Sequence, residues 1–203
     1  REAVAGSDAL VAASVGPFGA IRHDGSEYRG RYGVSRERLI DFHSERLEVL
    51  MSASPDLLAI ETVPDLDEVD ALVEVLRGHP DVPAWLTMTC ADAAHTSAGQ
   101  PIEDLVEAVR DVPSIRAVGV NCTAPEYVHG VLVRLAEAGA PRLVAYPNAG
   151  QAWSPDSGWA GNATGVGADL VATWREVPGL ALVGGCCGIG PDDVAAIARS
   201  LDR

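Results

Sequence analysis

The stretch that decides the fold is residues 115–146, which read IRAVGVNCTAPEYVHGVLVRLAEAGAPRLVAY. It opens and closes on short, nearly continuous apolar runs, Ala117–Asn121 and Leu143–Tyr146, as expected of parallel strands covered on both faces. Thr123 can cap a helix between the two runs. The apolar residues of that helix recur at helical spacing, at Val128, Val131, Leu132 and Leu135. A strand, a helix and a second strand in this order predict a parallel βαβ unit.

The same alternation continues on both sides of this unit. Four further apolar runs have the length and composition of strands: Leu10–Val15, Leu57–Glu61, Trp85–Thr89 and Leu180–Gly184. Together with the first two they make six strand–helix units, which predict an α/β fold with a parallel sheet.

The helices between the runs carry start signals of their own. Ser35 can cap a helix, and Asp65 followed by Glu68 resembles a capping box, in which each side chain bonds the other's backbone N–H. Pro101 suits the first turn of a helix. Two later helices are predicted over Gly167–Arg175 and Asp192–Leu201.

Two architectures compete for this pattern, an open doubly wound sheet and a (β/α)₈ barrel. The open sheet usually carries a glycine-rich phosphate loop after an early strand. Ser14–Gly19 matches such a loop poorly, because Pro17 removes an N–H donor and Phe18 crowds the turn. A barrel needs eight strands, and the sequence supplies six.

Composition excludes several classes of function. The 203 residues suit one domain, and a formal charge of −14 argues against a nucleic-acid partner, which usually meets a basic face. No apolar run approaches the roughly 20 residues of a membrane helix, and the first residues do not resemble a signal peptide. Four cysteines are too few for a secreted disulfide scaffold, so a cytoplasmic location is expected.

Three of the four cysteines occupy the same place in the predicted fold. Cys122 follows one strand, and Cys186 and Cys187 follow another, so all three lie at the carboxyl ends of strands. Adjacent residues on a regular strand point to opposite faces, but nearby glycines such as Gly185 and Gly188 let the backbone turn both sulfurs inward. Three thiolates leave one position of a tetrahedral zinc ion open, as in catalytic sites. The alternative is inert packing, because buried cysteines often behave as small apolar groups.

The net charge of such a site determines which kind of reaction it favours. Zn²⁺ with three thiolates is a net monoanion, which polarises carbonyls weakly but can hold a fourth sulfur as a nucleophilic thiolate. An activated methyl group is the natural electrophile, and a cationic sulfonium donor would favour an acidic, aromatic mouth. Two long connections, residues 16–34 and 147–164, follow strands and can form that mouth. Their candidate wall residues are Tyr28, Tyr146, Trp153 and Trp159. Cys90 also follows a strand, but we expect no ligand role for it.

The chain resembles the cobalamin-independent homocysteine S-methyltransferases, through essentially all 203 residues. The most specific mark is Gly184-Gly185-Cys186-Cys187-Gly188 taken together with Gly119-Val120-Asn121-Cys122. Weaker marks are Val11–Ala20, Asp24–Tyr28, Leu58–Thr62 and Tyr146–Gly150.

The resemblance implies a (β/α)₈ barrel, of which this chain holds about six of eight units in a single domain over residues 1–203. It implies Zn²⁺ bound by Cys122, Cys186 and Cys187, and methyl transfer from S-methylmethionine or S-adenosylmethionine to L-homocysteine, giving methionine. It also implies that Glu61 binds the amino group of homocysteine, and that Thr62, Asn121 and Asn148 line the substrate site. His43 lies on an apolar helix face and is expected in the core, whereas His95 receives no role.

Members of this family would carry two further βα units ahead of Leu10, with a turn that helps to bind the substrate carboxylate. A barrel without part of its wall exposes apolar surface and strand edges, so poor folding or association into a homo-oligomer is expected. Two alternatives stay open: a non-catalytic remnant that binds zinc or homocysteine, and a related methyltransferase that uses betaine or selenocysteine. The sequence does not select the methyl donor.

Overall fold

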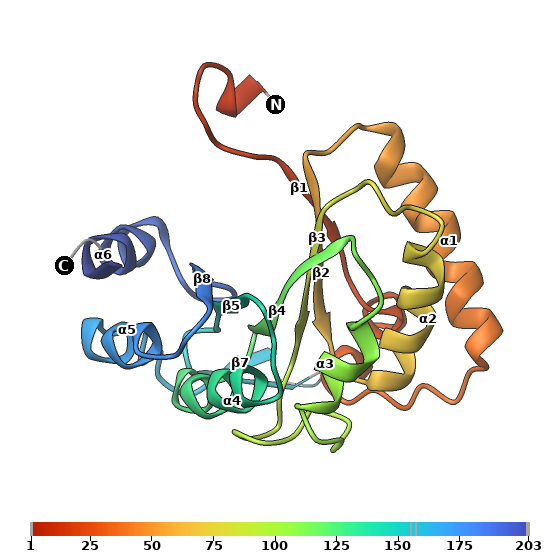
Figure 1. Ribbon diagram of the computed structural model, residues 1–203. Helices are drawn as coiled ribbons and strands as arrows, with labels where there is room; N and C mark the ends of the chain where they lie inside the picture. The colour runs from red at the N-terminus through yellow and green to blue at the C-terminus, as the bar shows by residue number, and fades with distance from the viewer. Residues whose placement is uncertain (1, 155, 157, 202–203) are drawn as a thin grey trace.

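The computed structural model describes residues 2–154, 156 and 158–201, and its centre is a six-stranded parallel sheet (Figure 1). The strands are β1 (Ala12–Val15), β2 (Leu57–Val63), β3 (Ala84–Met88), β4 (Ile115–Asn121), β5 (Leu143–Tyr146) and β8 (Leu180–Val183). Every predicted strand is present, and its bounds differ from the predicted ones by two residues or fewer at each end, as expected for pattern-based boundaries.

The order of the strands decides between the two candidate architectures. Each strand pairs in parallel with the one before it in the sheet, in the order β1-β2-β3-β4-β5-β8. A doubly wound sheet would reverse its order at a switch point, whereas a barrel adds its strands one after another around the wall. The chain is therefore a partial (β/α)₈ barrel, which confirms the predicted fold class. Across the described residues, β1 and β8 are the two edges of this wall.

Helices connect and cover the strands on the outside of the wall (Figure 1). They are α1 (Arg36–Ser52), α2 (Leu66–Leu76), α3 (Asp104–Val109), α4 (Pro125–Glu137), α5 (Ala168–Arg175) and α6 (Pro191–Leu201). Leu47, Leu72, Leu132 and Trp174 are fully buried on four of these helices. Each such side chain contributes about 1.5–3 kcal/mol of burial free energy. None of the described helices has the length and apolar character that crossing a bilayer would require.

Both long connections contain short regular elements. The segment after β1 forms two 3₁₀ turns, η2 (Phe18–Arg22) and η3 (Ser26–Tyr28), and a third, η1 (Glu2–Val4), precedes β1. The segment after β5 folds into an antiparallel hairpin of β6 (Ala152–Ser154) and β7 (Gly158–Ala160). Both segments leave the carboxyl ends of their strands, as expected.

Two predicted helix starts are wrong, and each has a local cause. α4 begins at Pro125 with Ala124 at its N-cap, because the Thr123 hydroxyl instead accepts from the Cys90 N–H at 2.9 Å and donates to the Asn121 carbonyl. α3 begins at Asp104, because Pro101 pairs in a β-bridge with His95 before the helix starts. Ser35, in contrast, caps α1 as predicted, by accepting from the Arg38 N–H.

The capping box predicted at α2 is half wrong. Asp65 is the N-cap and accepts from the Asp67 N–H, but Glu68 does not bond back to it. The Glu68 carboxyl group is fully buried and accepts from the Phe18 N–H at 2.6 Å and the Tyr32 hydroxyl at 2.7 Å. It also lies 2.9 Å from Nε2 of His43, which is a core histidine as expected. Glu68 therefore ties the long segment after β1 to α2.

Candidate metal centre

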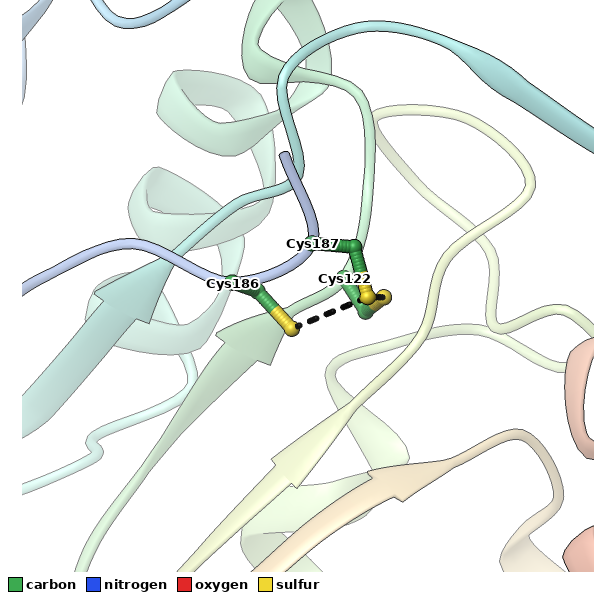
Figure 2. Close-up of side chains that lie close together, drawn as sticks. All are labelled: Cys122, Cys186 and Cys187. Carbon is green, nitrogen blue, oxygen red and sulfur yellow. Dashed lines mark hydrogen bonds between the residues drawn. The ribbon is translucent and has the colours of Figure 1, made fainter. Parts of the chain in front are cut away.

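Three cysteine sulfurs converge at the carboxyl ends of β4 and β8 (Figure 2). Sγ of Cys122 lies 3.5 Å from Sγ of Cys187, which in turn lies 3.9 Å from Sγ of Cys186. All three sulfurs are within 4.8 Å of one another, and all three cysteines are free thiols. Within the described residues, this is the one group of histidine, cysteine and acidic side chains with the spacing of a metal site.

Cys122 is held in an unusual backbone conformation. Its φ is 48°, in the left-handed region that residues other than glycine seldom adopt. The Cys122 N–H donates to the Tyr146 carbonyl at 3.2 Å, and its own carbonyl accepts from Nδ2 of Asn148 at 3.3 Å. The loop after β5 therefore fixes the direction in which the Cys122 side chain leaves β4.

The two adjacent cysteines lie past the end of β8, in a turn rather than on a pleated strand. The Cys186 N–H donates to the Pro147 carbonyl at 2.8 Å, and the Cys187 carbonyl accepts from the Ala149 N–H at 2.9 Å. The turn requires glycine on both sides of the pair. A Cβ at Gly185 would lie 2.1 Å from a methyl group of Ile189, and Gly188 has a φ of 80°.

The donor set fits a thiophilic cation such as zinc. Tetrahedral zinc with Zn–S bonds of about 2.3 Å has its sulfurs about 3.8 Å apart. The two shorter sulfur–sulfur distances, 3.5 and 3.9 Å, bracket that value. Three converging soft ligands in a cleft of the fold would leave one coordination position for a further sulfur.

The thiols also perturb one another. Hydrogen bonds donated by Cys122 and Cys186 lower the pKa of Cys187 to about 3, against an ordinary value of 9.0. Hydrogen bonds with Cys186 and Cys187, together with burial, raise the pKa of Cys122. The cluster therefore loses its first proton readily and holds the next more tightly, until a cation takes the place of the shared protons.

Tyr28 reaches this cluster from the segment after β1. Its hydroxyl lies 3.5 Å from Sγ of Cys122, and burial raises the pKa of Tyr28, so the group stays a neutral phenol. Tyr28 also lines a hollow of about 440 Å³ beside Cys122, together with Thr89, Tyr127 and Asn148. The side chains of Trp153 and Trp159 lie outside the described part of the structure.

Glu61 stands on the inner side of the site, near the end of β2. Its two carboxyl oxygens accept from the Ser14 hydroxyl at 2.6 Å and from the Tyr146 hydroxyl at 3.0 Å. The Tyr146 hydroxyl also lies 2.8 Å from Oγ1 of Thr87 and accepts from the Trp85 indole N–H at 3.0 Å. Tyr146 thus supports Glu61 rather than lining a wall beside the sulfurs.

Sequence reasoning missed Ser14 and Thr87. Trp85 and Thr87 are two positions apart on β3, so they share the inner face of the wall. The two-residue spacing of Trp85 and Thr87 was the sequence signal that could have identified Thr87.

Thr62 and Asn121 contact each other through two hydrogen bonds, at 2.8 and 2.9 Å.

The remaining cysteine and the loop histidine are not members of the three-thiol group. Cys90 is buried, and burial raises the pKa of its thiol to about 12. Nδ1 of His95 lies 3.0 Å from both carboxyl oxygens of Asp92. Neither residue belongs to the candidate metal site.

Fold and site together define a barrel-type α/β protein with a three-thiol centre at the carboxyl ends of its strands. The family model for homocysteine S-methyltransferase matches residues 1–201. A homocysteine S-methyltransferase from Zea mays is 41% identical over 201 residues, and one from Escherichia coli is 42% identical over 195 residues. The chain belongs to the homocysteine S-methyltransferase family.

A solved structure agrees with this assignment. The metallated form of the homocysteine methyltransferase MmuM from Escherichia coli superposes with a TM-score of 0.81 at 41% identity. The match covers 96% of this chain and 62% of the MmuM chain. The alignments to the Zea mays and Escherichia coli relatives cover 95% and 94% of this chain. They span 58% and 63% of those proteins' own lengths.

Proposed function

We propose that the protein transfers a methyl group from a sulfonium donor to the thiol of L-homocysteine, giving methionine, with zinc held by Cys122, Cys186 and Cys187. The observation that carries the proposal is the convergence of the three sulfurs within 4.8 Å of one another, with two of the sulfur–sulfur distances close to that of tetrahedral zinc. The family and the metallated form of a relative support it. Residues 1–203 are proposed to act as one barrel-type domain.

In this reaction the sulfur of homocysteine forms a bond to the methyl carbon, and the donor's sulfonium–methyl bond breaks. The donor leaves as a neutral thioether, and the thiol proton of homocysteine passes to solvent. Zinc, when bound, supplies the positive charge that keeps a fourth sulfur deprotonated at neutral pH.

The chain's own residues then bind and orient the two substrates. Glu61 accepts hydrogen bonds in its present surroundings and would pair with the ammonium group of homocysteine. Tyr28 directs its hydroxyl at Cys122, and among the described residues no Asp, Glu, Lys or Arg lines the hollow beside that cysteine. A cationic donor entering there would meet the faces of Tyr28 and Tyr127 and the negative field of the whole chain.

The test combines metal analysis with a product assay. The purified chain is expected to bind one zinc ion and to form methionine from homocysteine, with S-methylmethionine and S-adenosylmethionine compared side by side. Cys186→Ser should lose both zinc and activity, whereas Ser114→Ala, just before the opposite end of β4, should keep both. Methionine formation by zinc-free protein would refute the proposal, and so would zinc and homocysteine binding with no methionine from either donor.

A further inference from the structure

Asn121 is the last residue of β4 and precedes Cys122 in the chain, yet it has no exposed surface. Its Oδ1 accepts from the Thr62 N–H and from the Thr87 hydroxyl, both at 2.8 Å. Its Nδ2 donates to the Thr62 hydroxyl at 2.9 Å and to Sγ of Cys186 at 3.9 Å. An amide side chain has two acceptor and two donor positions, so all four are used. Asn121 has no bond left for a substrate.

The first effect of these bonds falls on the backbone beside Glu61. Thr62 has a φ of 64°, a left-handed conformation that is strained for a β-branched residue. The pairing of β2 with β3 shifts register between Ile60 and Val63, around this point. Two hydrogen bonds from Asn121 hold Thr62 in place, so they also fix the direction in which Glu61 leaves the strand.

A second route runs through side chains. Oγ1 of Thr87 lies 2.8 Å from Oδ1 of Asn121 and 2.8 Å from the Tyr146 hydroxyl, and it donates its single proton to one of them at a time. The Tyr146 hydroxyl donates to Glu61 at 3.0 Å. The Glu61 carboxyl group is therefore linked to Asn121 through its backbone neighbour and through Thr87 and Tyr146. On its other side, Asn121 contacts the sulfur of Cys186.

We infer that Asn121 is a positioning residue that holds Cys186 and Glu61 at a fixed separation. This separation makes the site selective for an amino-acid acceptor of matching length. The inference rests on the proposed function, in which the acceptor's sulfur lies at the thiol centre and its ammonium group lies at Glu61. Homocysteine is one methylene longer than cysteine between these two groups. A rigid separation therefore favours homocysteine, and one methylene is typically worth about 10–200-fold in discrimination.

Two variants of the full chain test the contact of Asn121 with Cys186 and its link to Glu61. Asn121→Asp keeps the acceptor oxygen that faces the Thr62 N–H and Thr87, but loses the Nδ2 donor to Cys186 and to the Thr62 hydroxyl. Thr87→Val keeps the contact between Asn121 and Cys186 and breaks the side-chain route to Glu61. Ser114→Ala is the matched control, because Ser114 is fully buried just before the other end of β4, far from the thiol centre.

The readouts use Co²⁺ as the probe and do not require turnover. The affinity for Co²⁺ is measured by competition with a chelator. Binding of homocysteine and of cysteine is followed through the Co²⁺–thiolate absorption, and circular dichroism checks that each variant is folded. Asn121→Asp should bind Co²⁺ about 10–100-fold more weakly, the usual effect of losing a group that supports a metal ligand. Thr87→Val should keep its Co²⁺ affinity and lose most of the preference for homocysteine over cysteine, and Thr87→Ser should restore that preference.

The results separate this inference from the proposed function. Unchanged Co²⁺ affinity in folded Asn121→Asp, or an unchanged homocysteine preference in folded Thr87→Val, would overturn the role of Asn121 while leaving the methyltransferase proposal intact. A parent chain that binds neither Co²⁺ nor homocysteine would overturn both. Ser114→Ala should match the parent in every readout, and a loss there equal to that of Thr87→Val would also overturn the inference.

Discussion

At the scale of single residues, the four cysteines differ in their chemistry because their surroundings differ. Burial raises the pKa of Cys90 to about 12, whereas hydrogen bonds from two neighbouring thiols lower that of Cys187 to about 3. Only a thiolate attacks an alkylating reagent. At pH 8 the Cys187 sulfur of metal-free protein is therefore ionised, whereas the buried Cys90 thiol stays protonated.

The first prediction follows from this contrast. In metal-free protein at pH 8, iodoacetamide should modify Cys187 quickly and leave Cys90 unmodified. Modification of Cys90 should begin only as the pH rises towards 12, since its folded-state pKa lies above the ordinary value. Peptide mapping by mass spectrometry gives the extent at each site. Equal labelling of the two cysteines in folded protein would contradict the assigned environments.

A second prediction concerns Glu61. Glu61→Gln keeps the shape of the side chain and removes its charge, so the KM for homocysteine should rise about 10–100-fold, as expected for loss of a hydrogen bond to a charged group. The zinc content and the kcat should change much less, because Glu61 is not among the grouped metal ligands. Steady-state kinetics with zinc analysis distinguishes these effects, and an unchanged KM would remove Glu61 as the anchor of the ammonium group.

Residue types and spacing were enough to predict that the three cysteines converge, because strand ends in a parallel sheet meet on one edge. The same reasoning could not reveal the left-handed φ of Cys122, or that all four hydrogen-bonding positions of the Asn121 side chain are used within the protein. Both depend on which carbonyl or hydroxyl a neighbouring strand presents, and that is fixed by register rather than by local pattern.

At the scale of elements, the strands were predicted more accurately than the helix starts. Apolar runs are long, redundant signals, whereas a cap depends on one side chain with several possible partners. Thr123 and Glu68 both have the right type and position for capping. Each instead accepts hydrogen bonds from a segment distant in sequence: Thr123 from Cys90, and Glu68 from Phe18 and Tyr32.

The third prediction tests the tie between α2 and the segment after β1. Glu68→Ala leaves the Phe18 N–H, the Tyr32 hydroxyl and His43 without their buried partner. Each unsatisfied buried group costs about 1–3 kcal/mol, so the free energy of unfolding should fall by at least about 3 kcal/mol. Urea titration measures the loss.

Glu74 supplies the control on the same helix. Its carboxyl group is 46% exposed and pairs with Arg36 and Arg77 at the surface. Glu74→Ala should therefore change the free energy of unfolding by less than about 1 kcal/mol. A similar loss in both variants would show that the Glu68 network contributes no more than a surface ion pair.

At the scale of the whole molecule, the partial wall leaves apolar surface uncovered at the amino ends of the strands. Leu10 is 69% exposed and Leu182 is 45% exposed, and with Trp85 they line a hollow of about 480 Å³. Such surface at an open sheet edge favours pairing between molecules.

The fourth prediction is therefore that the 203-residue chain associates with itself, more strongly as its concentration rises. Leu182→Lys places a charge in the uncovered hollow and should reduce the associated fraction. Val49→Lys changes an apolar residue that is 70% exposed on α1, outside the hollow, and should leave the fraction unchanged. Sedimentation velocity measures both variants. Equal association of the two would place the contact elsewhere.

The three sulfurs come from strand ends that β5 separates in the sheet and 65 residues separate in the sequence. Cys122 is therefore synthesised well before Cys187, and until then a nascent chain carries Cys122 without its two partner cysteines. Binding of one ion by all three thiols therefore requires that two segments distant in the sequence have already packed together.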